Sequence, residues 1–211
     1  MNSAPFWRAA AALAAALASC AQAAITGFVG DTTLEGGWFA FEDTFDVDMT
    51  VIHHGGAPYE TVTGIDVPEF GGVLKFDFPH SLRHVGYGWA TWSHGYTGEV
   101  FYTNGACFMG YDLHMSRVSA FDAYVEPNCD GCGSFVITAF GSAGGQASVD
   151  FYTSWCCAAR HFGFYSLDED VVRIEVWATG DWAIGEWRVG VPAPGSLALL
   201  ALAGTRRRRR R

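Results

Sequence analysis

The chain has almost no lysine, and its few basic residues gather at the two ends. Lys75 is the only lysine, and seven of the 13 Lys and Arg residues are Arg8 and the arginines at 206–211. The body between them holds six basic residues against all 22 acidic ones. A surface of this charge repels phosphate backbones. We therefore expect no nucleic-acid partner, and the acidity is typical of a soluble protein outside the cell.

Neither apolar segment of the chain is long enough to cross a bilayer as a stable helix. Residues 1–24 combine one positive charge at Arg8, an Ala/Leu stretch and small residues at Ala21–Ala23. This pattern predicts a secretory signal peptide that is cleaved after Ala23 or Ala24. The string Leu17–Cys20 resembles a lipobox, so lipidation at Cys20 is the alternative start of the mature protein.

Residues 25–190 lack helical periodicity and alternate with a period of two, which is typical of strands with one buried face. Strands are expected at 47–52, 73–78, 100–103, 118–126, 134–140, 161–165, 171–177 and 186–189. Within 118–126, the alternation places Asp122, Tyr124 and Glu126 on an outer, polar face. Many short strands separated by Gly-rich turns predict an all-β antiparallel sandwich or barrel, and we expect a single jelly-roll-like sandwich. An N-terminal signal helix and a short C-terminal apolar helix would flank it.

The composition changes at Val191. Pro192 and Pro194 cannot donate to a strand ladder, so the sheet is expected to stop there. Residues 196–204 are almost pure Leu and Ala and would form a helix of about 14 Å, roughly half a bilayer core. The tail would contact the membrane transiently, and the arginines that follow the apolar run would stay on the cytoplasmic side. This sorting signal over 191–211 comprises Val191, Pro192, Ala193, Pro194, Gly195, Arg206, Arg207, Arg208, Arg209, Arg210 and Arg211.

A proline pair, an apolar segment and a basic cluster in this order resemble the PEP-CTERM tail of exported bacterial proteins, with Ala193 where the usual motif has Glu. The resemblance implies recognition by an exosortase, a membrane cysteine transpeptidase. This partner would cut near Pro192–Pro194 and pass the protein to the cell envelope surface or the extracellular matrix. A basic tail that binds anionic lipid or nucleic acid is the alternative, but it explains neither the prolines nor the apolar run.

The strand series VSAFDAYVEPN, GSFVITAF, ARHFGFYS and VVRIEVWATGDWAIGEWRVG is similar to lectin-like or galactose-binding-like β-sandwich modules. The likeness covers roughly 101–190. It rests on strand motifs rather than on site motifs, so it implies a fold more than an activity.

An exported protein sits in oxidising surroundings, where disulfides are expected. The mature chain has an odd number of cysteines, so at least one thiol stays free or pairs between chains. The candidates are Cys107, Cys129, Cys132, Cys156 and Cys157. Cys129 and Cys132 could bond to each other or to the adjacent Cys156 and Cys157. Zinc is a poor alternative because no second CxxC exists.

The sequence lacks the motifs that would indicate a catalytic site or a metal site. There is no Gly-x-Ser-x-Gly elbow, and no glutamate lies between His80 and His84 as metalloprotease chemistry requires, so we expect surface or loop histidines. No cofactor is predicted. Calcium is the ion we would expect if one binds, although no Asp-x-Asp-x-Asp-Gly loop exists. Its candidate ligands are Asp31, Glu42, Asp43 and Glu186.

Exposed aromatic side chains offer a route to sugar binding, because an indole presents a flat apolar face to the C–H face of a sugar ring. Trp89, Trp92 and Tyr96 lie in one Gly-rich stretch, and Trp177 shares the polar face of its strand with Arg173. We therefore expect a non-catalytic module that binds glycan or exopolysaccharide. A structural matrix protein without a defined ligand is the alternative. A carbohydrate-active enzyme would need a buried carboxylate pair in a cleft.

Overall fold

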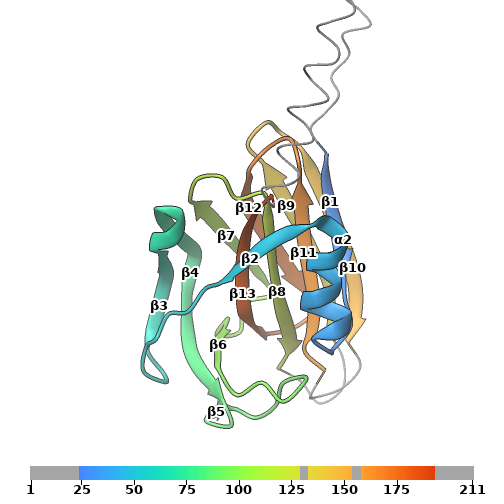
Figure 1. Cartoon of the computed structure of the whole chain (residues 1–211). Helices are drawn as coiled ribbons and strands as arrows, with labels where there is room; N and C mark the ends of the chain where they lie inside the picture. The colour runs from blue at the N-terminus through green and yellow to red at the C-terminus, as the bar shows by residue number, and fades with distance from the viewer. Residues whose placement is uncertain (1–23, 129–132, 154–157, 193–211) are drawn as a thin grey trace, which may run out of the picture.

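The computed structural model describes residues 24–128, 133–153 and 158–192, and these residues are mostly strand (Figure 1). The strands are β1 (Ile25–Val29), β2 (Val47–Val51), β3 (Thr61–Val67), β4 (Gly72–Val85), β5 (Gly88–Trp89), β6 (Glu99–Tyr102), β7 (Phe108–His114), β8 (Ala120–Pro127), β9 (Gly133–Gly141), β10 (Gln146–Thr153), β11 (Arg160–Ser166), β12 (Val171–Ala178) and β13 (Trp182–Pro192). The helical segments are a π-helical turn η1 (Glu35–Phe39), the helix α2 (Ala40–Phe45) and a 3₁₀ turn η2 (Pro68–Phe70).

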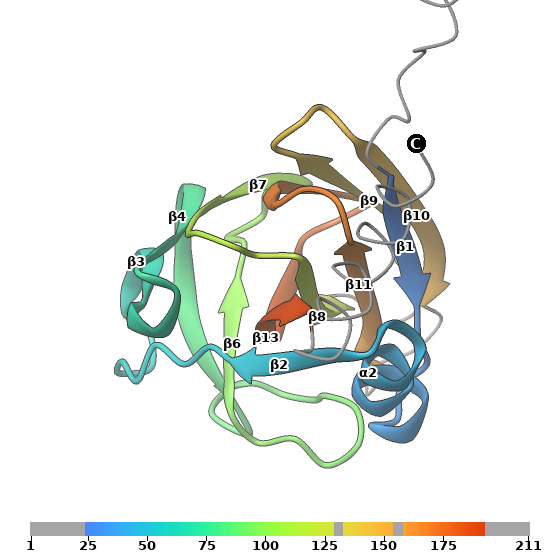
Figure 2. The same ribbon diagram turned by 45° about the horizontal axis from the view of Figure 1, so that its top comes forward.

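The strands form one sheet in the order β1-β11-β8-β13-β6-β4-β7-β12-β9-β10. In addition, β2 pairs with β13, and β3 and β5 pair with β4. Every pairing is antiparallel except that of β4 with β5. The sheet curls until β1 lies beside β10 (Figure 2), where a Cβ added to Gly27 would come within 2.5 Å of the Val149 side chain. The expected all-β, antiparallel, sandwich-like class is confirmed, whereas the expected flanking helices fall outside the described residues.

The two layers of the folded sheet enclose an aromatic core. The Trp187 ring from β13 stacks on Phe76 of β4 at 5.8 Å and meets Tyr111 of β7 edge-on at 5.0 Å. Phe121 of β8, the strand paired with β13, joins the cluster at 6.0 Å from Trp187. Full burial of a side chain of Phe size stabilises a fold by roughly 1.5–3 kcal/mol, so these rings hold the layers together.

All eight strands expected from alternation are present, with shifted ends. Strands β1, β3, β5, β7 and β10 were not expected. The expectation of a body without helix is wrong for 35–45, where η1 and α2 run end to end. They are too short to show a helical period. Phe41 anchors them: it is fully buried and packs over Gly163 of β11, where a Cβ would come within 2.5 Å of its ring.

The expected polar outer face of β8 is also wrong, because every residue of this strand is buried. Figure 1 shows α2 lying against β11, and β2 crossing in front of β8 and β13. Together with the loop at 89–96, these segments cover the face that carries Asp122, Tyr124 and Glu126. The buried polar cluster described below results from this cover.

The last strand runs slightly beyond the expected domain end at residue 190. Val191 pairs with Asp48 and Pro192 with Val47, both in β2. The pairing of β13 with β8 ends at Gly190, so Pro192 has a strand neighbour on one side, and an edge position of this kind tolerates a proline. The first two residues of the expected sorting tail therefore belong to the sheet.

Candidate ligand-binding face

The outer surface of β7, β12 and β9 carries a row of exposed apolar side chains. Trp177 is 47% exposed, and its cross-strand partners Phe108 and Val136 are each 42% exposed. Residues directly opposite each other in antiparallel strands share a face with Cβ atoms about 5 Å apart. Phe108, Trp177 and Val136 thus form one continuous strip, hereafter the aromatic row.

A pinned arginine lies on the same face, four residues before Trp177 in β12. Arg173 donates to Asp77 of β4 at 2.6 Å, to Asp112 of β7 at 2.7 Å and to Glu175 at 2.9 Å. The hydrogen bond from Arg173 lowers the pKa of Asp77, and the same contacts raise the pKa of Arg173. These four side chains, hereafter the charged cluster, tie three strands together.

The charged cluster needs a glycine beneath it. Gly110 of β7 lies under the Arg173 guanidinium, and a Cβ there would come within 2.0 Å of Arg173 Nη2 and 2.2 Å of Asp77 Oδ2. Any side chain at residue 110 would push Arg173 off its path across β7. The absence of a side chain lets one arginine reach from β12 to β4.

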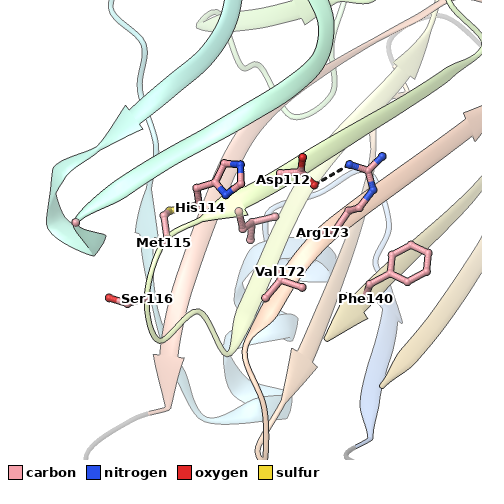
Figure 3. A pocket seen from close by; sticks show the side chains of 9 residues that line it. Asp112, His114, Met115, Ser116, Phe140, Val172 and Arg173 are labelled. Atoms are coloured by element: carbon pink, nitrogen blue, oxygen red, sulfur yellow. Dashed lines mark hydrogen bonds and ion pairs between the residues drawn. The ribbon is translucent and has the colours of Figure 1, made fainter. Parts of the chain in front are cut away.

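Beyond the charged cluster the face is hollowed into an open, shallow depression of about 720 Å³. Figure 3 shows the Asp112–Arg173 ion pair at its edge, with His114 and Met115 to one side and Phe140 to the other. The lining residues are Gly71, Asp112, Leu113, His114, Met115, Ser116, Phe140, Val172 and Arg173. The aromatic row, the charged cluster and this depression follow one another along β12.

The expected sugar platform at Trp89, Trp92 and Tyr96 is wrong. Trp89 is 8% exposed and Trp92 is 6% exposed. Each indole N–H donates at 2.6 Å to a buried carboxylate, that of Glu126 for Trp89 and that of Glu186 for Trp92. Tyr96 is half-buried, its hydroxyl donates to a backbone carbonyl, and burial raises its pKa. Of the four expected contact residues, only Trp177 is exposed.

The covered face of β8 holds a cluster of charges that the sequence did not reveal. Asp122 accepts from His161 at 2.9 Å and from two nitrogens of Arg188. Arg188 also donates to Glu42 of α2 at 2.6 Å, and its guanidinium lies 4.4 Å from the Trp38 ring centre. This network fastens η1 and α2 to β8, β11 and β13. Breaking one partner of such a buried pair destabilises a protein by about 3–5 kcal/mol.

A second part of the covered face has the hydrogen-bond order of a catalytic triad. Ser93 Oγ lies 2.8 Å from His94 Nδ1, and His94 Nε2 lies 3.0 Å from Glu186 Oε2. His94 and Glu186 both have positive φ angles, 42° and 55°, and Glu186 lies where the register of β13 with β8 shifts. Strained, hydrogen-bonded residues of this kind occur at active sites.

Burial argues against catalysis at this triplet. Ser93 is 2% exposed, and the enclosed cavity beside Glu186 has about 40 Å³, room for water but not for a sugar ring. Burial lowers the pKa of His94, but the hydrogen bond and charge of Glu186 outweigh it, so the net shift is upward. The triplet instead fastens the loop at 89–96 to β13, and we refer to it as the latch.

The expected calcium ligands do not gather at one point. Asp31 accepts from the Thr33 backbone and hydroxyl, which lowers its pKa, and Glu42 accepts from Arg188. Asp43 is exposed on α2, and Glu186 belongs to the latch. Across 24–128, 133–153 and 158–192, no three His, Cys, Asp or Glu side chains are placed to hold a metal ion.

The expectation of a surface or loop histidine is wrong for His80. His80 is fully buried, and burial lowers its pKa to about 4. Its Nδ1–H donates to Phe78 O, and its Nε2 accepts from the Tyr111 hydroxyl. It is therefore not a surface histidine.

Cys107 is exposed and unpaired. The other cysteines, 129, 132, 156 and 157, lie outside the described residues, so their pairing stays a prediction.

The loops beside β5 present another exposed aromatic pair, which the sequence analysis did not single out. Tyr59 is 55% exposed and Tyr87 is 63% exposed, with ring centres 5.9 Å apart. The guanidinium of Arg83 lies 4.3 Å from the Tyr59 ring centre. This pair is the natural comparison for the aromatic row.

No family model matches the chain, and neither a curated protein nor a solved structure matches it. Among the residues that the structure describes, no helix is long and apolar enough to cross a membrane. The expected signal peptide up to residue 23, Cys20 included, and the sorting tail from Ala193 onward lie outside those residues. The resemblances to PEP-CTERM tails and to lectin-like modules therefore stay predictions.

Proposed function

We propose that this protein is an exported, non-catalytic module that binds glycan or exopolysaccharide through the outer face of β7, β12 and β9. The observation that carries the proposal is the half-exposed Trp177, in register with Phe108 and Val136 and next to the charged cluster. An indole face packs against the apolar face of a sugar ring. Carboxylate oxygens beside it accept hydrogen bonds from ring hydroxyls.

The charged cluster supports this proposal because its side chains are already ordered. Immobilising a flexible side chain at an interface costs about 0.5–1.5 kcal/mol, and Arg173 has removed that cost for Asp77, Asp112 and Glu175. Clustered exposed apolar side chains with a polar rim are typical of interaction sites. The aromatic row with its neighbouring carboxylates fits that description.

We further propose that the module works at the cell envelope surface or in the extracellular matrix of a bacterium, after processing by an exosortase-type enzyme. This proposal rests on the order of prolines, apolar run and arginines at 191–211 and on the acidic body. A structural matrix protein is the second candidate. The exposed, unpaired Cys107 favours it, because a free thiol outside the cell can join two chains.

The test of glycan binding is a comparison of two aromatic truncations in the full chain. Trp177→Ala removes the centre of the aromatic row, and we expect polysaccharide affinity to fall about tenfold or more, a loss of roughly 1.4 kcal/mol or more. Tyr87→Ala removes a ring that is even more exposed and lies beside β5, outside the aromatic row, and it should leave affinity unchanged. Affinity electrophoresis through gels that contain each polysaccharide measures both. Loss of binding in Tyr87→Ala alone would move the site to the loops beside β5.

A further inference from the structure

Carboxylates outnumber cations on the candidate face, and its arginine is already paired. The guanidinium of Arg173 is already taken by three carboxylates. Lys75, the other cation of the face, is exposed and lies opposite Asp112 in the register of β4 and β7. Asp150 of β10 is exposed and lies opposite Val136, at the end of the aromatic row. Acidic groups on this face therefore outnumber basic ones, as they do over the whole body.

The features of the face are too far apart for one sugar. Trp177 and Arg173 are four residues apart in β12, which is about 13 Å along a strand. The depression begins at Arg173 and Val172 and continues to His114 on one side and Phe140 on the other (Figure 3). A single pyranose ring that stacks on Trp177 would leave the depression unfilled.

From these two observations we infer that the ligand is an uncharged, extended polysaccharide that lies along β12, from the aromatic row across the charged cluster into the depression. This inference rests on the proposed function. Pinned carboxylates accept hydrogen bonds from the hydroxyls of a neutral chain. They repel the carboxylates of a uronic-acid chain, because like charges a few ångström apart in a partly desolvated contact are unfavourable.

The first experiment separates the ligand class from the proposed function. The full chain is run through affinity gels that contain neutral polymers (dextran, β-glucan, galactomannan) or anionic ones (polygalacturonate, alginate, hyaluronate). We expect retardation by at least one neutral polymer and by no anionic one. Equal or stronger retardation by an anionic polymer overturns the inference and leaves glycan binding standing. Retardation by no polymer contradicts the proposed function itself.

The second experiment tests chain length with fragments of the neutral polymer that binds. Isothermal titration of the full chain with fragments of one and six sugar units should give at least a tenfold weaker dissociation constant for the single unit. Equal affinity would mean that one subsite at Trp177 suffices, and the extended placement along β12 would be wrong.

The third experiment reverses the charge preference. The double variant Asp77→Asn/Glu175→Gln removes two charges and leaves Arg173 with Asp112 alone, so polygalacturonate should now retard the protein at low salt. The matched control Glu35→Gln/Asp48→Asn removes two exposed charges from η1 and β2, on the other layer. We expect no polygalacturonate binding in this control. The same gain in both variants would attribute exclusion to overall charge and contradict a role for the face. Thermal unfolding confirms that each variant is folded.

Discussion

Two histidines, the buried His80 and the half-buried His94, have opposite effects on stability as pH changes. His80 has a pKa lowered to about 4, because its burial disfavours the charged form. His94 has a raised pKa, because the hydrogen bond and charge of Glu186 outweigh burial. An unfolded chain would titrate both near pH 6.5. Each histidine therefore changes stability on a different side of that value.

The sign of each effect follows from which state binds the proton more tightly. Between pH 6.5 and 4 the unfolded chain protonates His80 and the folded protein does not, so stability falls as pH falls, by up to about 3 kcal/mol. Above pH 6.5 the folded protein still holds the proton on His94, and its stabilising contribution is lost as pH rises through the folded pKa. We expect the free energy of unfolding to peak near pH 6.5, as measured by urea denaturation at a series of pH values.

The control for this pH prediction is His94→Gln, which removes the titration but keeps a side chain that can hydrogen-bond to Glu186. The decline above pH 6.5 should disappear in this variant, whereas the decline on the acidic side should remain. A wild-type stability that rises steadily from pH 6.5 to 8 would show that the latch does not hold a proton.

At the scale of elements, alternation in the sequence was sufficient to locate eight strands and the outward direction of Trp177. It could not locate β1 or β3, because alternation in five to seven residues is a weak signal beside the glycines they contain. Alternation tells which residues share a face but not whether another segment covers that face. For this reason Asp122 and Glu126 were expected at the surface and lie buried.

The errors at Trp89 and Trp92 have the same origin. A Gly-rich stretch with aromatic and polar residues is typical of an exposed loop, and nothing local indicates a carboxylate partner. Glu126 and Glu186 lie 37 and 94 residues away in sequence from the tryptophans they accept from. Only the pairing of β8 with β13 brings both carboxylates beneath the loop. The role of Arg188, 146 residues from Glu42, was hidden in the same way.

At the scale of the molecule, the two layers of the sheet differ in whether their outer face is covered. The helix α2 covers the layer that contains β8 and β11, and the charged side chains of this layer hold α2 in place. The layer that contains β7, β12 and β9 leaves its aromatic row and charged cluster uncovered. Among the residues that the structure describes, the candidate binding face therefore lies on the layer opposite α2.

The sorting proposal predicts the mass of the protein isolated from its own host. Cleavage at the proline pair would follow β13, which ends at Pro192, so no described strand would be lost. We expect terminal peptide mapping to find a start near Ala24 and an end near Pro194. Retention of Arg206–Arg211 would contradict exosortase processing, and a lipid mass at Cys20 would favour the lipobox alternative.

The measurement that tests glycan binding by the outer face most directly is hydroxyl-radical footprinting of the full chain, with and without the neutral polysaccharide that binds it. Peptide mass spectrometry reads the oxidation of each aromatic side chain. The account predicts that Trp177 and Phe108 become protected while Tyr59 and Tyr87 react as before. Protection of Tyr59 and Tyr87 with Trp177 unchanged would contradict it and place the ligand at the loops beside β5.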